Sequence, residues 1–163
     1  MSRNQRGAPA MRCVPRVTAF GWLAALLAWV GSLAQASVLS NQSVATELVP
    51  GEARFDILLP PDYTAEREEP YPLLLWLHGG SSGEHQLERR LRAPLERAWE
   101  KGTIEPIVVV APITGNSYWI DWKGGGNDWE TFLLTELLAH VRATYHVEQG
   151  RAGTVIGGAS AGG

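Results

Sequence analysis

Three short apolar runs, separated by two amphipathic stretches, constrain the fold of this chain most. The runs cover residues 73–77, 107–110 and 154–156. Continuous apolar runs of this length are typical of strands that are buried on both faces of a mostly parallel sheet. Strand, helix, strand, helix, strand is the order that right-handed crossovers produce, with the helices lying on the faces of the sheet. The sequence therefore predicts an α/β fold.

The two stretches between these runs show helical periodicity. The first covers residues 84–101, and Pro94 within it predicts a kink or two shorter helices. The second is predicted to begin at a capping box formed by Asn127 and Glu130. The apolar stripes comprise Leu87, Leu91, Leu95 and Trp99 in the first helix, and Phe132, Leu134, Leu137, Leu138, Val141 and Tyr145 in the second.

An antiparallel hairpin is predicted before the first apolar run. Residues 43–49 and 53–59 flank the pair Pro50-Gly51, which favours a tight turn. Apolar and polar side chains alternate in the second strand, which predicts one buried face. We expect the hairpin first, then the mostly parallel sheet, in which the strand at 154–156 is central.

The first 36 residues differ from the rest. An apolar run over 17–30 precedes small residues at Ala34 and Ala36, which is the order of a secretory signal peptide cleaved after Ala36. An uncleaved anchor is the alternative, and either Met1 or Met11 can be the start. The basic residues before the run are Arg3, Arg6, Arg12 and Arg16.

The segment left after cleavage, 37–163, is acidic. Its net charge is −7, because the leader removes four arginines and no acidic residue from a chain of net charge −3. This argues against a nucleic-acid partner or an anionic membrane surface. The one cysteine, Cys13, lies in the leader, and no cluster of side chains has the spacing of a zinc site. We expect neither a metal nor a cofactor.

The motif Gly158-Ala159-Ser160-Ala161-Gly162 directly follows the third apolar run. It fits the G-x-S-x-G nucleophile elbow, in which a turn between strand and helix holds the serine in strained backbone geometry. Small residues are needed at Gly158 and Gly162, because two chain segments pass close together there. The motif predicts Ser160 as a catalytic nucleophile.

A second motif, His78-Gly79-Gly80, ends the first apolar run. In a hydrolase with such an elbow, this loop supplies one N–H of the oxyanion hole, and the residue after the nucleophile supplies the other. Gly80 and Ala161 are the candidate donors. We expect His78 to brace the loop rather than act as the base, because the base follows the nucleophile in this chain order.

An aromatic loop over 112–126 leaves the end of the second apolar run, at the sheet edge where open α/β folds bind ligands. It carries Tyr118, Trp119 and Trp122. One interpretation is that these side chains line the substrate pocket. The equally favoured alternative is that they pack the loop onto the sheet.

Together, residues 77–80, 118–121, 129–133 and 158–163 resemble the "Putative esterase" family, which groups esterase D-like, feruloyl esterase-like and mycolyltransferase-like α/β hydrolases. The resemblance runs from about Phe55 to Gly163. It implies the α/β-hydrolase fold and an acyl-serine mechanism without a cofactor. It also implies an acidic residue and a histidine after the elbow. We therefore expect 37–163 to be the N-terminal part of such a domain, truncated after the elbow and inactive alone.

The function expected from these features is that of an exported serine esterase, secreted or periplasmic. Its partner would be a small-molecule or carbohydrate-linked ester, and no membrane contact is expected after signal cleavage. Two alternatives stay open. An acyltransferase would use the same machinery, and a non-catalytic carbohydrate-binding module would use the aromatic loop.

Overall fold

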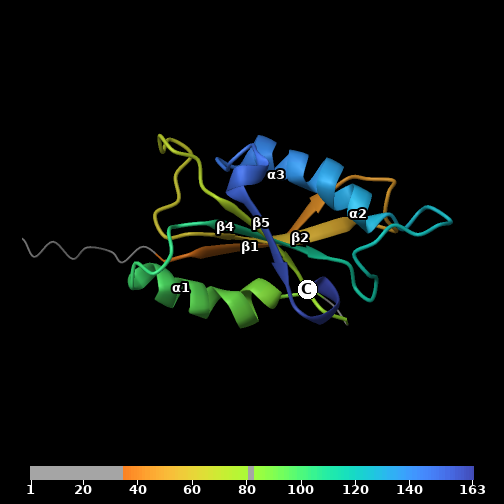
Figure 1. Ribbon diagram of the computed structural model, residues 1–163, viewed down its shortest axis with the longest axis horizontal. Helices are drawn as coiled ribbons and strands as arrows, with labels where there is room; N and C mark the ends of the chain where they lie inside the picture. Colours follow the sequence, from red (N-terminus) through yellow and green to blue (C-terminus); the bar gives the residue numbers. More distant parts are fainter. Residues whose placement is uncertain (1–34, 81–82) are drawn as a thin grey trace, which may run out of the picture. The chain divides into compact units, whose positions relative to one another are not determined.

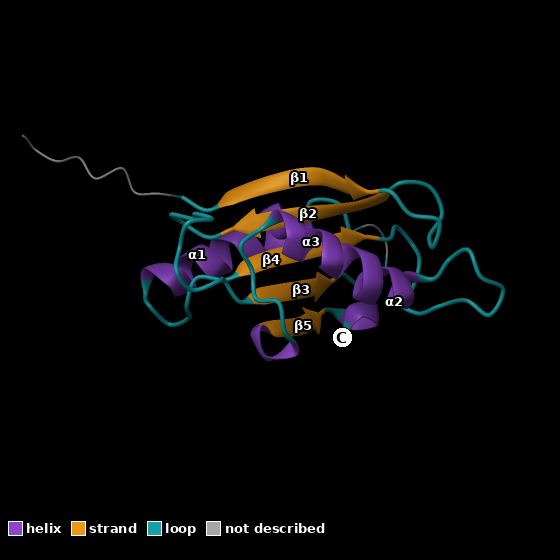
Figure 2. Cartoon of the chain, turned by 90° about the horizontal axis from the view of Figure 1, so that it is seen from above, coloured by secondary structure: helices purple, strands orange, loops and turns teal. Residues whose placement is uncertain are grey.

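A mixed five-stranded sheet forms the centre of the computed structural model, which describes residues 35–80 and 83–163. The predicted signal segment lies outside the described residues, except for its last two positions. The strands stand in the order β1-β2-β4-β3-β5 (Figure 2). Their bounds are Ser37–Val44 for β1, Ala53–Leu59 for β2, Leu73–Leu77 for β3, Val108–Ile113 for β4 and Thr154–Gly158 for β5.

The pairing of the strands confirms an N-terminal hairpin followed by a parallel sheet. β1 pairs with β2, and β2 with β4, in antiparallel fashion. β3 pairs in parallel with both β4 and β5. Because the carboxyl ends of parallel strands meet at one edge, the loops after β3, β4 and β5 gather there. This edge contains both predicted motifs and the aromatic loop.

Helices cover both faces of the sheet (Figure 1). One face carries a continuous helix made of the π-helical turn η1 and helix α1. The other carries helix α2, the π-helical turn η2 and helix α3 in succession. The bounds are Leu87–Leu91 for η1, Arg92–Glu100 for α1, Trp129–Thr131 for α2, Phe132–Leu137 for η2 and Leu138–Thr144 for α3.

The first helix follows its predicted pattern. Its stripe packs on a small apolar cluster of the sheet that includes Leu58 and Val109. On its other face, Arg92 pairs with Glu88 at 3.1 Å and with Glu96 at 2.9 Å. The helix changes from a π-helical to an α-helical turn at Arg92, two residues before Pro94, without a break between η1 and α1. The stretch is therefore not divided into two separate helices, and the predicted kink at Pro94 stays a prediction.

The larger core lies between the sheet and the second helix, and it corrects the predicted stripe. Leu133 is buried, whereas Leu134 is 52% exposed. A π-helical turn contains more residues than an α-helical one, so η2 turns Leu134 away from the face shared by Phe132 and Leu137. The core side chains include Phe55, Ile57, Leu73, Leu75, Val108, Val110, Phe132, Leu133, Leu137 and Val141.

The hairpin exists, but its predicted first strand is misplaced. β1 ends at Val44, so Pro50 and Gly51 lie in an eight-residue loop rather than in a two-residue turn. Gly51 does adopt the positive φ, 72°, that a turn glycine is suited to. Residues 45–49 of the predicted first strand therefore belong to the loop.

β2 is buried on both faces, which contradicts the prediction of one buried face. Phe55 and Ile57 face the larger core, while Leu58 joins the smaller cluster under α1. Asp56 is also buried, and its Oδ1 accepts the backbone N–H of Asn41 at 3.0 Å. Asn41 lies in a bulge of β1, so a local irregularity of the neighbouring strand supplies the partner that a buried carboxylate needs.

The strand of the second apolar run extends past Val110 into the residues predicted to begin the aromatic loop, because β4 continues through Pro112 to Ile113. Pro112 pairs with Phe55 of β2, whereas the register with β3 stops at Val110. A proline has no backbone N–H to donate, so it is tolerated at positions of a strand where no neighbouring strand accepts a hydrogen bond from it.

β5 pairs with β3 on one side, and no described strand pairs with its other side. Its apolar residues Val155 and Ile156 are exposed. The expectation that this strand is central stays a prediction. Within residues 35–80 and 83–163, no helix has both the length and the apolar character required to cross a membrane.

Candidate active site

The backbone at Ser160 has the shape of a nucleophile elbow. β5 ends at Gly158 and Ala159 is extended. Ser160, the first residue of the 3-10 turn η4 (Ser160–Gly162), has a φ of 55°. A positive φ is uncommon for a residue with a side chain, and it clusters at functional sites where the surroundings enforce it. The exposed serine therefore stands at the tip of a strained turn.

Two glycines are required by close packing in this turn. A Cβ atom at Gly158 would lie 2.5 Å from the carbonyl oxygen of Leu77 and would overlap the carbonyl of Gly162. A Cβ at Gly162 would overlap the carbonyl oxygen of Leu77 in turn. The predicted need for small residues is confirmed. Leu77, whose carbonyl oxygen approaches both glycines, is the last residue of β3. The elbow therefore packs against the end of the strand that leads to the motif His78-Gly79-Gly80.

The loop after β3 lies directly against the serine. A Cβ atom at Gly79 would lie 3.1 Å from both Ser160 Cβ and the carbonyl oxygen of Ala159. Gly80 follows at once in the chain, and Ala161 follows Ser160 within η4. The two candidate oxyanion donors thus belong to segments that meet at Ser160.

His78 fastens this loop to the end of β4. Its buried ring accepts the backbone N–H of Thr114 at Nε2, over 3.2 Å. Since a backbone N–H can only donate, Nε2 carries no proton, and Nδ1 donates to the carbonyl oxygen of Gly79 at 2.6 Å. A Cβ at Gly83 would overlap the imidazole, so the ring fills its site. The predicted bracing role of His78 is confirmed.

No hydrogen bond joins a histidine to Ser160 in the described part of the chain, which includes all four. His85 lies exposed just before η1, with a φ of 60°. His140 packs edge-on against Phe55, with 5.8 Å between ring centroids. The backbone N–H of His146 donates to the hydroxyl of Tyr63 at 2.8 Å. None of the four described histidines is therefore placed to act as the base for Ser160.

Trp119 is buried and contacts the bracing histidine. Its indole N–H donates to the carbonyl oxygen of His78 at 2.9 Å, and the two rings meet edge-to-face with centroids 4.9 Å apart. By contrast, Tyr118 is 61% exposed and Trp122 is 56% exposed. Of the three aromatic residues predicted to line the pocket or pack the loop, Trp119 packs against the fold, whereas Tyr118 and Trp122 face solvent.

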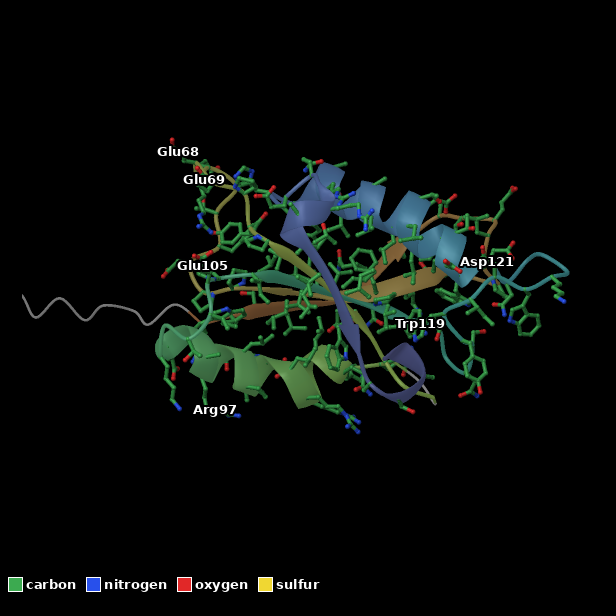
Figure 3. The ribbon with its side chains drawn as sticks, viewed as in Figure 1. Glu68, Glu69, Arg97, Glu105, Trp119 and Asp121 are labelled. Atoms are coloured by element: carbon green, nitrogen blue, oxygen red, sulfur yellow. The ribbon has the colours of Figure 1, made fainter. Side chains whose placement is uncertain are left out.

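Asp121 anchors the aromatic loop to the start of α2, as the labelled side chain in Figure 3 shows. Its carboxylate accepts the backbone N–H of Thr131 at 3.0 Å and the Thr131 hydroxyl at 2.6 Å. These hydrogen bonds, the hydroxyl first, lower the pKa of Asp121 below its ordinary value. A carboxylate at the first turn of a helix satisfies donors that have no intrahelical partner.

The predicted capping box of Asn127 and Glu130 is wrong, and the hydrogen bonds from Thr131 to Asp121 take its place. The N-cap residue is Asp128, and it makes no side-chain cap bond. Asn127 is buried, and its Oδ1 accepts the hydroxyl of Ser117 at 3.3 Å instead. The helix is capped from Asp121, ten residues before Thr131 in the chain, which local spacing does not reveal.

An apolar cavity of about 350 Å³ lies beside the ends of β3 and β5. Trp119 and Ile120 of the aromatic loop form part of its wall. The remaining lining residues are Leu75, Leu77, Glu130, Leu133, Leu134 and Ile156. Within the described ranges, no group of three or more His, Cys, Asp or Glu side chains could hold a metal ion.

The sheet order, the crossovers and the strained serine after β5 define the class as an α/β hydrolase. The chain belongs to the "Putative esterase" family, whose sequence pattern matches residues 46–163. A comparison with curated proteins gave no sequence match.

Solved structures share this fold. A ferulic acid esterase is 24% identical, with a TM-score of 0.70, over 79% of this chain and 51% of that one. A mutant feruloyl esterase module from Clostridium thermocellum, complexed with sinapinate, is 18% identical, with a TM-score of 0.60, over 80% and 46%. The fluorophosphonate-binding serine hydrolase F of Staphylococcus aureus is 18% identical, with a TM-score of 0.56, over 78% and 49%. The chain thus spans about half the length of the structures that it matches.

Proposed function

We propose that the protein is an exported serine esterase that hydrolyses carboxylic esters through an acyl-serine intermediate on Ser160. The observation that carries this proposal is the positive φ of Ser160, 55°, at the tip of a turn against which Gly79 packs. Such strain persists where the surrounding structure enforces it, and it presents a serine hydroxyl at the loop edge of the sheet. The family and the names of the solved structures above agree with an esterase.

In the proposed mechanism, Ser160 Oγ attacks the ester carbonyl carbon while a base takes its proton. The N–H groups of Gly80 and Ala161 bind the oxyanion that forms. When the intermediate collapses, the carbon–oxygen bond to the alcohol breaks, and the protonated base returns its proton to the alcohol. Water then attacks the acyl-serine by the same sequence and releases the acid.

We propose that the base and its acidic partner are not among the 163 residues. Both ring nitrogens of His78 are hydrogen-bonded, and the other three histidines lie on other parts of the fold. A serine without a base keeps an ordinary hydroxyl, so the segment 37–163 by itself should hydrolyse no ester above background. That segment should also be insoluble or partly folded, because β5 exposes Val155 and Ile156 at the edge of the sheet. Serine-dependent turnover by that soluble segment would contradict this proposal.

For the substrate, we propose a small-molecule or carbohydrate-linked ester that contacts the aromatic loop. Tyr118 and Trp122 offer exposed rings, and Trp119 forms part of the wall of the apolar cavity. Aromatic faces of this kind suit flat apolar groups and sugar rings. Alanine at Tyr118 or Trp122 should raise KM and leave the labelling of Ser160 unchanged.

The function is tested with the protein expressed from its native coding sequence. Wild type should hydrolyse a p-nitrophenyl ester, and Ser160→Ala should lose turnover by about a million-fold, as in a serine protease without its nucleophile. An alcohol added to the assay separates two outcomes, because an acyltransferase would yield the new ester faster than the free acid. Sugar binding with no turnover would instead indicate a binding module.

Export is tested by the N-terminal sequence of the protein recovered from the periplasm or the medium. We propose that it begins at Ser37, since Ala34 and Ala36 are the small residues that signal peptidase requires. The side chain of Ala36 is buried in the smaller cluster, so this cleavage removes one methyl group from that cluster. A first residue upstream of Val30 would contradict cleavage and favour the anchor.

A further inference from the structure

We propose that Trp119 is a positioning residue of the oxyanion loop, acting through the carbonyl group of His78. This inference rests on the proposed role of Ser160. The indole of Trp119 donates to the carbonyl oxygen of His78 at 2.9 Å, and both residues are buried. A buried carbonyl that lost this donor would be left unsatisfied, so its peptide group would turn towards another partner.

The peptide group in question leads directly to the serine. The carbonyl of His78 belongs to the same peptide plane as the N–H of Gly79, and a rotation of that plane moves the residues that follow. Gly79 lies against Ser160, with only 3.1 Å between a Cβ at Gly79 and Ser160 Cβ. The Trp119 hydrogen bond therefore sets the orientation of the loop at the point where it meets the nucleophile.

The ring of His78 holds the loop at other points. Its Nε2 accepts the N–H of Thr114, its Nδ1 donates to the carbonyl oxygen of Gly79 at 2.6 Å, and Gly83 closes the space beside the ring. The bond to Gly79 restrains the next peptide group, between Gly79 and Gly80. The Trp119 hydrogen bond acts on the peptide group between His78 and Gly79 itself, and it comes from the loop that follows β4.

Trp129 provides a matched control. Its side chain is also buried, and its ring packs edge-on against Trp119, with centroids 6.1 Å apart. Its indole N–H has no hydrogen-bond partner among the described residues. Tryptophan to phenylalanine removes the same atoms at both positions, but only at Trp119 does it remove a hydrogen bond.

The experiment compares Trp119→Phe and Trp129→Phe in the native gene product with a p-nitrophenyl ester. A misplacement of about 1 Å can cost on the order of 100-fold in rate, so Trp119→Phe should lower kcat by about 10- to 100-fold. KM should change by less than kcat, because phenylalanine keeps an aromatic ring in the cavity wall while the lost hydrogen bond concerns the transition state. Trp129→Phe should change neither. Equal kcat values for the two variants, or a change in KM alone at Trp119, would overturn the inference.

A second measurement does not depend on catalysis. In ¹⁵N NMR spectra, the amide signals of Gly79 and Gly80 should shift in Trp119→Phe and stay in place in Trp129→Phe. Unchanged amides in Trp119→Phe would overturn the positioning role even if the variant were slow. If wild type failed to react with a fluorophosphonate, the esterase proposal would fall, while the amide signals would still decide whether Trp119 orients the loop.

Discussion

The backbone N–H of Ala159 donates to the carbonyl oxygen of Leu77 at 3.1 Å, which fastens the turn before Ser160 to the end of β3. The same carbonyl leaves no room for a side chain at Gly162. One oxygen atom therefore both holds the elbow by a hydrogen bond and determines which residue types the elbow accepts.

Gly162→Ala is expected to deform the elbow, because its Cβ would overlap the carbonyl oxygen of Leu77. Overpacking of this kind costs about 1–3 kcal/mol in the free energy of unfolding. Labelling of Ser160 by a fluorophosphonate should slow at the same time, since the turn that presents the serine moves. Denaturant unfolding and labelling rates measure the two effects.

Gly157→Ala is the matched control for that variant. A Cβ at Gly157 would lie 3.6 Å from Leu74 Cδ1, an ordinary van der Waals distance. It should leave both the stability and the labelling rate close to those of wild type. If Gly157→Ala and Gly162→Ala behaved alike, the contact with Leu77 would not be what restricts the elbow.

Asp121→Asn should lower the melting temperature at neutral pH, because an amide group cannot replace both acceptor roles that the carboxylate plays towards Thr131. The pKa of Asp121 is lowered in the folded protein, so this stabilisation is present above the ordinary pKa, about 4, and is lost as pH falls through the folded value. The gap in melting temperature between wild type and variant should therefore narrow below about pH 4.

Glu100→Gln serves as the control for the pH series, since Glu100 is an exposed carboxylate at the end of α1. Its melting curves should follow those of wild type at each pH. A gap for Asp121→Asn that stayed constant, or widened, into the acidic range would show that the Thr131 contacts do not stabilise the charged form of Asp121.

The features predicted well from the sequence are those that repeat locally. The run at 73–77 is β3 as expected, and the four-residue spacing from Leu87 to Trp99 does place one face of the first helix on the sheet. The elbow is recognisable because Gly158 and Gly162 each lie two residues from Ser160 in the chain. Periodicity and short motifs need no knowledge of distant segments, so one sequence is enough to find them.

The features that were missed depend on contacts between distant segments. The helix that begins at Trp129 takes its cap from Asp121, and the π-helical turn η2 exposes Leu134 although its spacing fits a buried stripe. The bracing role of His78 was predicted, but its partners Thr114 and Trp119 lie 36 and 41 residues away. Such pairs become visible only once β3 and β4 are placed side by side.

The role of Ser160 as the nucleophile is tested most directly by the mass of the native gene product after reaction with a fluorophosphonate, followed by mapping of the modified peptide. We expect one phosphonyl group per chain on the peptide that contains Ser160, and none in Ser160→Ala. Because the reagent reacts with an activated serine, this outcome would establish both the nucleophile and its activation. Full esterase activity in a Ser160→Ala variant, or modification at another residue, would contradict it.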